Sequence, residues 1–320
     1  MVTLSDIRTA RLRLEGVTVR TKLVPFPLCA EDPRQLWLKP ENKQPIGAFK
    51  LRGAYNKIAS LSDAERKRGV ISYSSGNHAQ GVAYAARALK TKSVIVMPNN
   101  APIIKREATA KLGAEIVLVG PGSDERKTRA EQLAAQHGYV IVPPYNDEHI
   151  IAGQGTIGLE IFDELPEVET VLAPVGGGGL ISGVGAAIKW SNSDVKVIGV
   201  EPELAADAQA SLRQRKIVQF PAEQVSRTLA DGLRTQSIGP INFEHIRAYV
   251  DDIITVTEDE IRKAMRYLAA NPETVAEPSG AVSVAGFVFH ASELPKTKVN
   301  VAIISGGNVE RQMLEELRRS

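Results

Sequence analysis

Short apolar segments alternate with longer, amphipathic segments along most of this 320-residue chain. The apolar segments have the length of buried strands, and the segments between them have the length of helices. In the first half of the chain, the expected strands are 70–73, 93–97, 116–119 and 139–142, and the expected helices are 80–90, 103–112 and 123–136. Apolar strands separated by helices predict open, mainly parallel twisted sheets flanked by helices, so we expect an α/β fold.

The alternation predicts two domains. Residues 69–146 contain enough strands for a sheet of their own, so we expect a small domain here, inserted into a large domain made of residues 1–68 and 147–320. Five further strands are expected in the large domain, at 36–38, 170–174, 195–200, 253–256 and 299–304, together with a helix at 155–165. In open parallel sheets, ligands bind at the carboxyl ends of the strands, so the loops that follow the strands are the place to look for function.

Composition excludes several classes of function. The 39 basic and 37 acidic residues nearly balance, which gives no electrostatic reason to expect nucleic-acid binding. The N-terminus has no signal-peptide pattern, and no apolar run reaches membrane-spanning length. The single cysteine, Cys29, fits a reducing compartment. We therefore expect a cytoplasmic globular protein.

Lys50 lies between Phe49 and Leu51 in the segment Gly-Ala-Phe-Lys-Leu-Arg-Gly-Ala, residues 47–54. Burial lowers the pKa of a lysine because it disfavours the ammonium form, and a neutral amine can form a Schiff base. A lysine at the start of an amphipathic helix whose stem packs on apolar neighbours would have the same local sequence. The segment alone leaves both interpretations open.

Four consecutive glycines, Gly176 to Gly179, separate an expected strand from an expected helix. Free backbone amides at a helix N-terminus favour phosphate binding. The spacing of Gly177, Gly179 and Gly183, with Glu201 at the end of the next strand, also approximates a dinucleotide site in which Glu201 would bind a ribose. Close packing of the strand against the helix is the alternative without a ligand.

The loop Ser74-Ser75-Gly76-Asn77-His78 also joins an expected strand to an expected helix. Its hydroxyls, amide side chain and free backbone amides could bind a carboxylate, or the loop could simply cap the helix. Ser305 follows the last expected strand in the segment Ser-Gly-Gly-Asn.

Taken together and in order, these motifs resemble the fold-type II pyridoxal-phosphate enzymes, whose fold is similar to that of the tryptophan synthase β chain. The motifs are the Lys50 segment, Ser-Ser-Gly-Asn-His-Ala-Gln-Gly, Ala-Gly-Gln-Gly-Thr at 152–156, the four glycines and Ser305-Gly-Gly-Asn. Within these enzymes the chain looks like the threonine dehydratase and serine racemase group. The resemblance covers nearly the whole chain.

This resemblance implies a set of cofactor contacts. Lys50 would form the Schiff base with pyridoxal 5'-phosphate, and Phe49 would pack against the pyridoxal ring. Asn77 would bind the 3-oxygen of the ring, Ser305 would face the ring nitrogen, and the backbone at Gly232 would flank the ring. The cofactor phosphate would be held by Gly176, Gly177, Gly178, Gly179 and Leu180. The substrate carboxylate would be bound by Ser74, Ser75, Asn77 and His78.

A second site is expected in the segment 201–207. The carboxylates of Glu201 and Asp207 and the carbonyl of Ala205 can offer oxygens to Mg²⁺ or Mn²⁺. The racemase group has a divalent-ion site of this pattern, which implicates these three residues, whereas charges in a solvated loop would need no metal.

The expected reaction is the α,β-elimination of L-threonine and L-serine to a 2-oxo acid and ammonia. Ser75 leaves serine racemisation open, because a hydroxyl opposite Lys50 supplies a second acid/base group and eukaryotic-type serine racemases carry serine here. A related hydroxyaspartate ammonia-lyase has a similar loop, so 3-hydroxyaspartate is a further candidate substrate.

Two interpretations from other classes remain. An NAD(P)-dependent oxidoreductase would explain the glycines but would leave Lys50 and the Ser74–His78 loop without roles, and a non-catalytic amino-acid sensor could retain the whole pocket. Enzymes of this fold are commonly dimers, so we expect a homodimer.

Overall fold

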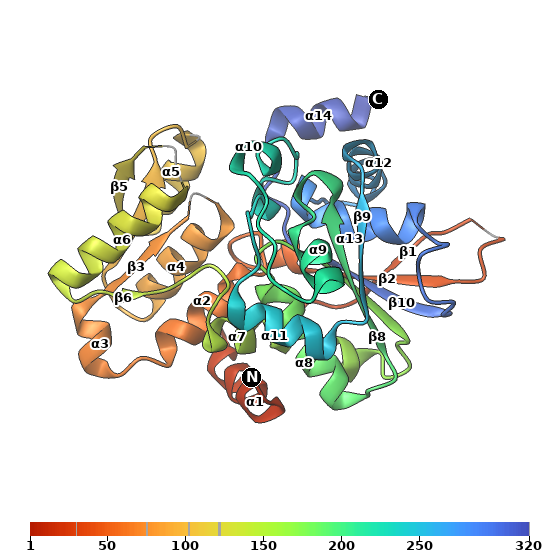
Figure 1. Ribbon diagram of the computed structural model, residues 1–320, viewed down its shortest axis with the longest axis horizontal. Coiled ribbons are helices and arrows are strands. Elements are labelled where there is room, and N and C mark those ends of the chain that lie inside the picture. Colours follow the sequence, from red (N-terminus) through yellow and green to blue (C-terminus); the bar gives the residue numbers. More distant parts are fainter. Residues whose placement is uncertain (30, 75, 102, 121–122, 320) are drawn as a thin grey trace.

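The computed structural model describes residues 1–29, 31–74, 76–101, 103–120 and 123–319, which form two β-sheets flanked by helices (Figure 1). The larger sheet has six strands in the order β1-β2-β10-β7-β8-β9, and the smaller has four in the order β5-β4-β3-β6. Neighbouring strands are parallel except for β1 and β2, which are antiparallel. The predicted α/β fold with mainly parallel sheets is confirmed.

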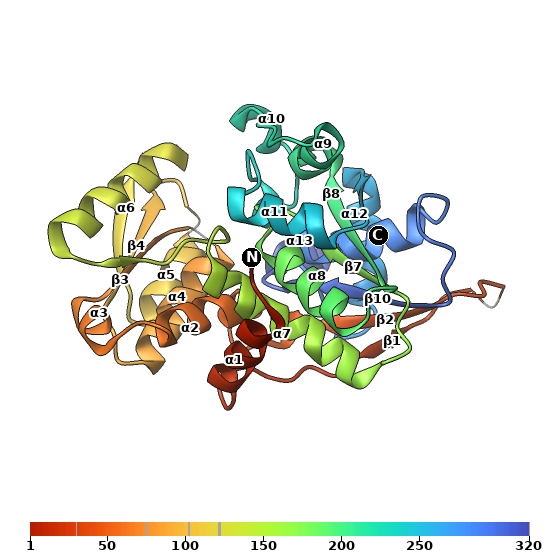
Figure 2. The same ribbon diagram turned by 60° about the horizontal axis from the view of Figure 1, so that its bottom comes forward.

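The larger sheet is buried on both faces. Its strands are β1 (Val24–Phe26), β2 (Gln35–Pro40), β7 (Thr170–Pro174), β8 (Lys196–Pro202), β9 (Asp252–Val256) and β10 (Val299–Ile304). Along β10, Val301 and Ile303 belong to one apolar cluster, while Ala302 and Ile304 belong to another on the opposite face. Five helices supply most of the other residues of these clusters and are seen around the sheet in Figure 2: α7 (Glu148–Glu164), α8 (Gly179–Ser191) and α11 (Pro240–Tyr249) on one face, and α12 (Glu258–Ala269) and α13 (Pro278–Phe289) on the other.

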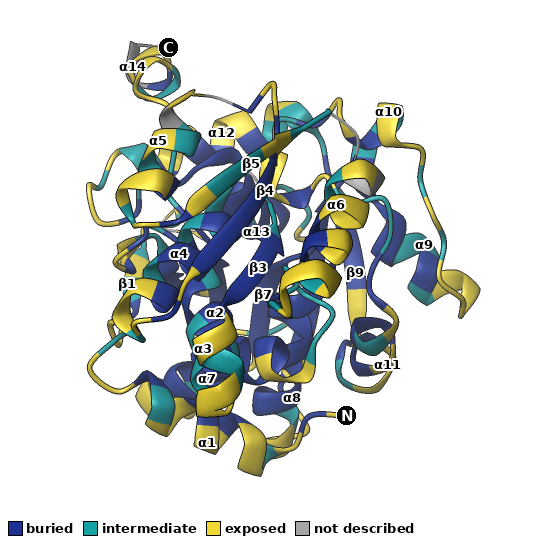
Figure 3. Cartoon of the chain, turned by 90° about the vertical axis from the view of Figure 1, so that its left-hand side faces the viewer, coloured by how far each residue is buried: buried dark blue, intermediate teal, exposed yellow. Residues whose placement is uncertain are grey.

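The smaller sheet lies to one side of the larger one and has the same layered organisation. Its strands are β3 (Val70–Tyr73), β4 (Ser93–Pro98), β5 (Glu115–Val119) and β6 (Val140–Ile141). Helix α4 (Asn77–Ala88) packs on one face, and α6 (Ser123–His137) packs on the other. Figure 3 shows the resulting pattern, in which β3 and β4 are buried and the outer surface of α6 is exposed.

The remaining elements connect and cover the two sheets. They are α1 (Leu4–Leu14), η1 (Glu41–Lys43), α2 (Lys50–Ala59), α3 (Asp63–Arg68), α5 (Ile103–Lys111), η2 (Glu203–Ala205), α9 (Asp207–Gln214), α10 (Ala222–Val225), η3 (Asp231–Leu233) and α14 (Arg311–Arg319). Helix α2 contacts both α4 of the smaller sheet and α7 of the larger one. Within the described residues, no helix combines the length and the apolar character needed to cross a membrane.

The expected start of helix α7 at residue 155 is wrong. The helix begins at Glu148, because the side chain of Asp147 accepts hydrogen bonds from the backbone amides of His149 (2.9 Å) and Ile150 (3.1 Å). The glycines near the expected start lie inside the helix, where they permit close packing. A β-carbon on Gly153, for example, would lie 2.7 Å from the backbone oxygen of Arg52 on α2.

Candidate active site

The loops that carry the sequence motifs meet where the two sheets face each other. Lys50 is the first residue of α2, and Asn77 is the first residue of α4, directly after the loop that follows β3. The glycine loop follows β7, and Ser305 follows β10. In each case the loop lies at the carboxyl end of a parallel strand or at the start of a helix, as expected for a ligand site in this fold class.

The side chain of Lys50 is half-buried in this region. Its Nζ donates a hydrogen bond of 2.8 Å to the backbone oxygen of Pro144 and lies 5.2 Å from the centre of the Phe49 ring. Burial lowers the pKa of Lys50 from its ordinary value of 10.5 to about 8. The neutral amine, which is the form that can attack a carbonyl group, is therefore far more populated near neutral pH than in an ordinary lysine, although the ammonium form still predominates at pH 7.

A chain of hydrogen bonds ties Lys50 to Ser305 and Gly232. The backbone amide of Phe49 donates to the backbone oxygen of Ser305 at 3.0 Å. The Ser305 hydroxyl donates to the backbone oxygen of Ser279 at 3.3 Å, and the Ser279 hydroxyl accepts from the amide of Gly232 at 2.9 Å. Three of the residues predicted to contact the cofactor thus share one hydrogen-bonded frame with Lys50.

The glycine loop forms an uncapped helix start. Gly178 is the N-cap of α8, has a positive φ of 92°, and supplies no side chain to the free amides of the first turn. A β-carbon on Gly176 would lie 3.2 Å from Leu233, and one on Gly179 would lie 3.0 Å from the β-carbon of Tyr145. A side chain at these positions would crowd Leu233 or Tyr145, so glycine keeps the free amides clear of side chains of the loop itself, although Gly177, Gly178 and Gly179 are buried. Leu180 follows in the first turn with its side chain in the core. This arrangement fits a phosphate group.

The Ser74–His78 loop approaches Lys50 from the smaller sheet. His78 is buried and its Nε2 lies 3.1 Å from the backbone oxygen of Val142, while its Nδ1 has no hydrogen-bond partner within the described part of the chain. Burial and the charge of Lys50 lower the pKa of His78 to about 3, so the ring is neutral. The Ser74 hydroxyl accepts a long hydrogen bond from the amide of Gly76 at 3.4 Å. Ser75 lies outside the described residues.

The segment from β8 to α9 places two buried carboxylates together. Both oxygens of Glu201 accept backbone amides at the start of α9, from Ala208 at 3.1 Å and from Gln209 at 2.8 Å. Burial and the charge of Asp207 raise the pKa of Glu201. Because Glu201 is fully buried and already bonded in this way, it is not placed to bind a ribose, which removes the support for a dinucleotide site.

Asp207 lacks the partners that a buried carboxylate normally has. Neither of its oxygens makes a hydrogen bond of good geometry within the described residues. Burial raises its pKa to about 7, although the backbone amides of Asp207 and Ile238 oppose this shift. Ala205, also fully buried, lies between the two acids in the chain. Two close buried carboxylates without a cationic side chain fit a divalent cation, although no group of three or more His, Cys, Asp or Glu side chains gathers among the described residues.

Sequence reasoning missed two residues of the site. Tyr145 packs over the glycine loop, and burial, together with Tyr73 and Asp207, raises its pKa to about 12. Glu277 accepts a hydrogen bond from Asn77 at 2.5 Å and is 5% exposed. Tyr145 directly follows the Pro143-Pro144 pair, which ends a strand and could have marked a loop of the site. No local sequence pattern marks Glu277.

Comparison with known proteins agrees with this geometry. The family model described as "Pyridoxal-phosphate dependent enzyme" matches residues 14–306. The chain is 47% identical over 320 residues to the L-threonine ammonia-lyase of Thermotoga maritima, an alignment that covers 99% of this chain and 78% of the relative. It is 43% identical over 276 residues to the L-threo-3-hydroxyaspartate ammonia-lyase of Saccharomyces cerevisiae, covering 86% of this chain and 83% of the relative.

The fold has a similarly close match among solved structures. The serine racemase of Dictyostelium discoideum superposes with a TM-score of 0.90 at 36% sequence identity, covering 97% of this chain and 99% of that one. The family match and these relatives extend over nearly all of the chain, including every loop of the candidate site. The chain therefore belongs to the family of pyridoxal-phosphate dependent enzymes.

Proposed function

We propose that this protein is an ammonia-lyase that converts L-threonine and L-serine to a 2-oxo acid and ammonia. The observation that carries the proposal is the amine of Lys50, whose pKa burial lowers to about 8. This amine donates to the backbone oxygen of Pro144, and the next residue, Tyr145, packs against the uncapped glycine loop. A phosphate cradle and a reactive amine close together are the requirements for holding pyridoxal phosphate.

Lys50 has two tasks in this proposal. Pyridoxal phosphate, when bound, supplies an electron sink that acidifies the Cα proton of the amino acid attached to it. The Nζ of Lys50 would hold the cofactor, and as a free neutral amine it would remove this proton as a general base. A pKa near 8 suits both tasks, because the neutral amine is populated near neutral pH and is still basic enough to take up a proton.

The remaining site residues bind and orient. We assign the phosphate to the backbone amides from Gly176 to Leu180 and the substrate carboxylate to the loop at Ser74, Asn77 and His78. The neutral His78 ring uses its N–H on the backbone oxygen of Val142, so His78 would offer the carboxylate its backbone amide in the first turn of α4. Phe49 would cover the ring of the cofactor.

Ser305 as the partner of the ring nitrogen favours elimination. A serine does not stabilise a protonated ring nitrogen as a carboxylate would, so negative charge at Cα is better released by loss of the β-hydroxyl than stored. L-serine would then give pyruvate, and L-threonine would give 2-oxobutanoate. The L-threonine ammonia-lyase at 47% identity supports this choice of reaction.

Serine racemisation is the second candidate, and the serine at position 75 favours it. A hydroxyl on the ring face opposite Lys50 would let Cα be protonated from either side. Ser75→Ala should abolish racemisation and leave elimination of L-serine measurable. Racemisation that survives this change would contradict the two-base assignment. The relative from S. cerevisiae makes L-threo-3-hydroxyaspartate the third substrate to assay.

We further propose that Glu201, Asp207 and the backbone oxygen of Ala205 hold Mg²⁺ or Mn²⁺. The support is the unsatisfied, buried carboxylate of Asp207 and the raised pKa values of both acids, because a divalent cation would offset their mutual repulsion.

The wider organisation is also a proposal. We assign residues 69–146 to a small domain that carries the carboxylate-binding loop, and 1–68 with 147–320 to a large domain that binds the cofactor. We propose a homodimer, and a cytoplasmic location, with which the single, unpaired Cys29 is consistent.

The test is direct assay of the purified protein loaded with pyridoxal phosphate. L-threonine and L-serine should each yield a 2-oxo acid and ammonia in equal amounts, and Lys50→Ala should yield neither. A protein that binds the cofactor but releases no product from these substrates or 3-hydroxyaspartate would be a sensor. A protein that takes up no cofactor would contradict the proposal altogether.

A further inference from the structure

Glu277 is a buried carboxylate of the site to which none of the sequence motifs gave a role. It is the N-cap of α13, and its backbone amide donates to the oxygen of Gly306 at 3.1 Å. Its own backbone oxygen accepts from the amides of Gly280 (2.8 Å) and Ala281 (3.1 Å). These contacts fix the main chain at Glu277 beside the Ser305 loop.

The side chain of Glu277 belongs to a relay of three polar groups. Its Oε1 accepts from Nδ2 of Asn77 at 2.5 Å. The Oδ1 of Asn77 accepts in turn from Nδ2 of Asn308 at 2.8 Å, and the same Asn308 nitrogen donates to the backbone oxygen of Ile46 at 2.9 Å. The relay therefore runs from α13 through the first residue of α4 to the loop after β10.

The backbone around this relay is shaped to admit it. A β-carbon on Gly306 would overlap Oε1 of Glu277 and would lie 3.1 Å from Nδ2 of Asn77. A β-carbon on Gly47, where φ is +71°, would overlap the side-chain amide of Asn308. Glycines at both motif positions thus leave space for the carboxylate and the amide, which ties the relay to the Lys50 and Ser305 motifs.

The relay determines which way round the Asn77 amide lies. Above its pKa of about 7, the carboxylate of Glu277 only accepts hydrogen bonds, so it selects the NH₂ group of Asn77, while the NH₂ group of Asn308 selects the Asn77 oxygen. An amide nitrogen carries two hydrogens, and Glu277 uses one of them. No other hydrogen bond among the described residues uses this nitrogen, so the second N–H of Asn77 is available to a ligand.

We propose that Glu277 is a positioning residue that fixes the Asn77 amide in one orientation and leaves its second N–H available to the 3-oxygen of the pyridoxal ring. This inference rests on the proposed function, in which Asn77 binds that oxygen. Glu277 itself acts through Asn77 and need not touch the cofactor. Burial, and after it the charge of Asp231, raises the pKa of Glu277 to about 7, while the hydrogen bond from Asn77 and the charge of Lys105 lower it.

Glu277→Ala tests the proposal in two readouts. Cofactor affinity, measured by titrating pyridoxal phosphate into cofactor-free protein, should fall about tenfold, the effect of losing one well-placed hydrogen bond. The ratio of visible to near-ultraviolet absorbance of the bound cofactor should also fall, because a donor to the 3-oxygen stabilises its ionised form. In Glu277→Gln, the amide oxygen can still accept from Asn77, so this variant should keep most of the wild-type affinity and absorbance ratio.

The matched control is Glu273→Ala. Glu273 lies four residues before Glu277, is about half exposed, and pairs with Lys43 away from the relay. This variant should keep the affinity and spectrum of the wild type. Glu277→Asp retains the charge but withdraws the carboxylate from Asn77, so it should lower both the affinity and the absorbance ratio, as Glu277→Ala does. It replaces the alanine variant if that variant does not fold.

A double-variant comparison separates positioning from a general structural effect. If Glu277 acts through Asn77, adding Glu277→Ala to Asn77→Ala should change neither the affinity nor the spectrum further. The proposal would be overturned if Glu277→Ala reduced cofactor affinity equally in the wild-type and Asn77→Ala proteins. A Glu277→Ala spectrum identical to that of the wild type would also overturn it. A wild-type protein without any cofactor band would instead refute the proposed function, and with it this role of Glu277.

Discussion

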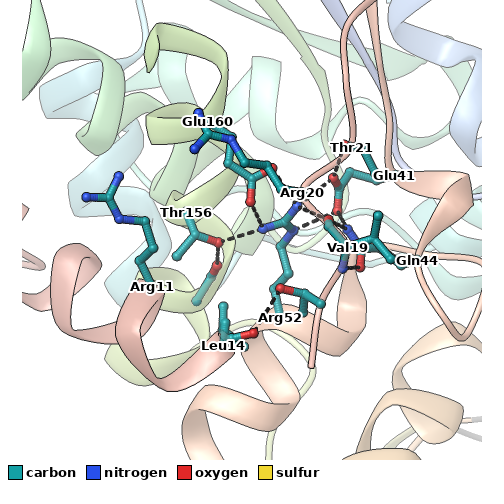
Figure 4. A network of polar contacts seen from close by, with 12 residues as sticks. Arg11, Leu14, Val19, Arg20, Thr21, Glu41, Gln44, Arg52, Thr156 and Glu160 are labelled. Atoms are coloured by element: carbon teal, nitrogen blue, oxygen red, sulfur yellow. Dashed lines mark hydrogen bonds and ion pairs between the residues drawn. The ribbon is translucent and has the colours of Figure 1, made fainter. Parts of the chain in front are cut away.

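Replacing Arg52 by methionine should destabilise the protein by about 3 to 5 kcal/mol, the usual cost of leaving buried charges unpaired. Arg52 lies two residues after Lys50 on α2 and is fully buried. Figure 4 shows its guanidinium between the carboxylates of Glu41 and Glu160. The four hydrogen bonds to these acids span 2.6 to 2.9 Å, and a fifth, of 3.1 Å, reaches the Thr156 hydroxyl.

The magnitude follows from the charges in this cluster. Two cations, Arg52 and Lys39, face two carboxylates, and Lys39 donates to Glu160 at 2.6 Å. Burial alone would raise the pKa of Glu41, but the charge and hydrogen bonds of Arg52, together with Lys39 and the Thr21 hydroxyl, outweigh it, and the pKa is lowered. Without the guanidinium, the cluster would carry one uncompensated negative charge in an interior that solvates it poorly.

Urea denaturation of the cofactor-free protein, followed by circular dichroism, measures the effect. The control is Arg11→Met, since Arg11 pairs with Asp163 at 3.1 Å and both side chains are more than 40% exposed. Its loss should cost less than about 1 kcal/mol. The double variant Arg52→Met/Glu41→Gln should be more stable than Arg52→Met, because it removes the excess charge. Equal losses in Arg52→Met and Arg11→Met would refute the reasoning.

Three further outcomes are expected. The rate at which cofactor-free protein incorporates pyridoxal phosphate should rise with pH through about 8, because the Nζ of Lys50 loses its proton, and should then level off. Stopped-flow absorbance measures this rate, and a rate that does not change from pH 6 to pH 9 would contradict the prediction. Burial raises the folded-state pKa of Asp207 from 3.8 to about 7, so the metal-free protein should lose stability as the pH rises from 4 to 7. Mg²⁺ should restore the melting temperature at pH 8 but not at pH 4, and a melting temperature without this pH dependence would argue against the metal site. Gly178→Ala should weaken cofactor binding as well as stability, since its β-carbon would lie 2.9 Å from Asn242, whereas Gly113→Ala, at a similar positive φ in open space, should affect stability alone.

Much of the fold was predictable because strands and helices here are strongly periodic. The strands β3, β4, β7 and β10 were expected within about one residue of their ends, since each is an apolar run that is buried on both faces. The capping boxes that open α3 and α12 were also recognisable, because the pairs Ser62/Glu65 and Thr257/Glu260 act within one turn.

The errors have equally local causes. The glycines of α7 resemble a turn in sequence, but in the fold they allow contact with α2 and α8. Helix α13 was not expected because it is nearly all apolar, so it lacks the periodicity that marks an amphipathic helix.

The site was predictable where a motif carried it and unpredictable where tertiary contacts did. Lys50, Asn77, the glycine loop and Ser305 each lie at an element boundary that the sequence marks. Glu277 acquires its role from contacts with Asn77, 200 residues away in the chain, and no spacing rule reports such a contact. The same is true of Arg52, whose partners come from η1 and α7.

The central claim is that Lys50 is the residue that holds pyridoxal phosphate. Borohydride reduction of the cofactor-loaded protein, followed by proteolysis and mass spectrometry, tests it most directly. The account predicts one modified peptide, which contains Lys50, and none in Lys50→Ala. A cofactor attached to another lysine, or an unmodified Lys50 peptide in a protein that binds the cofactor, would contradict it.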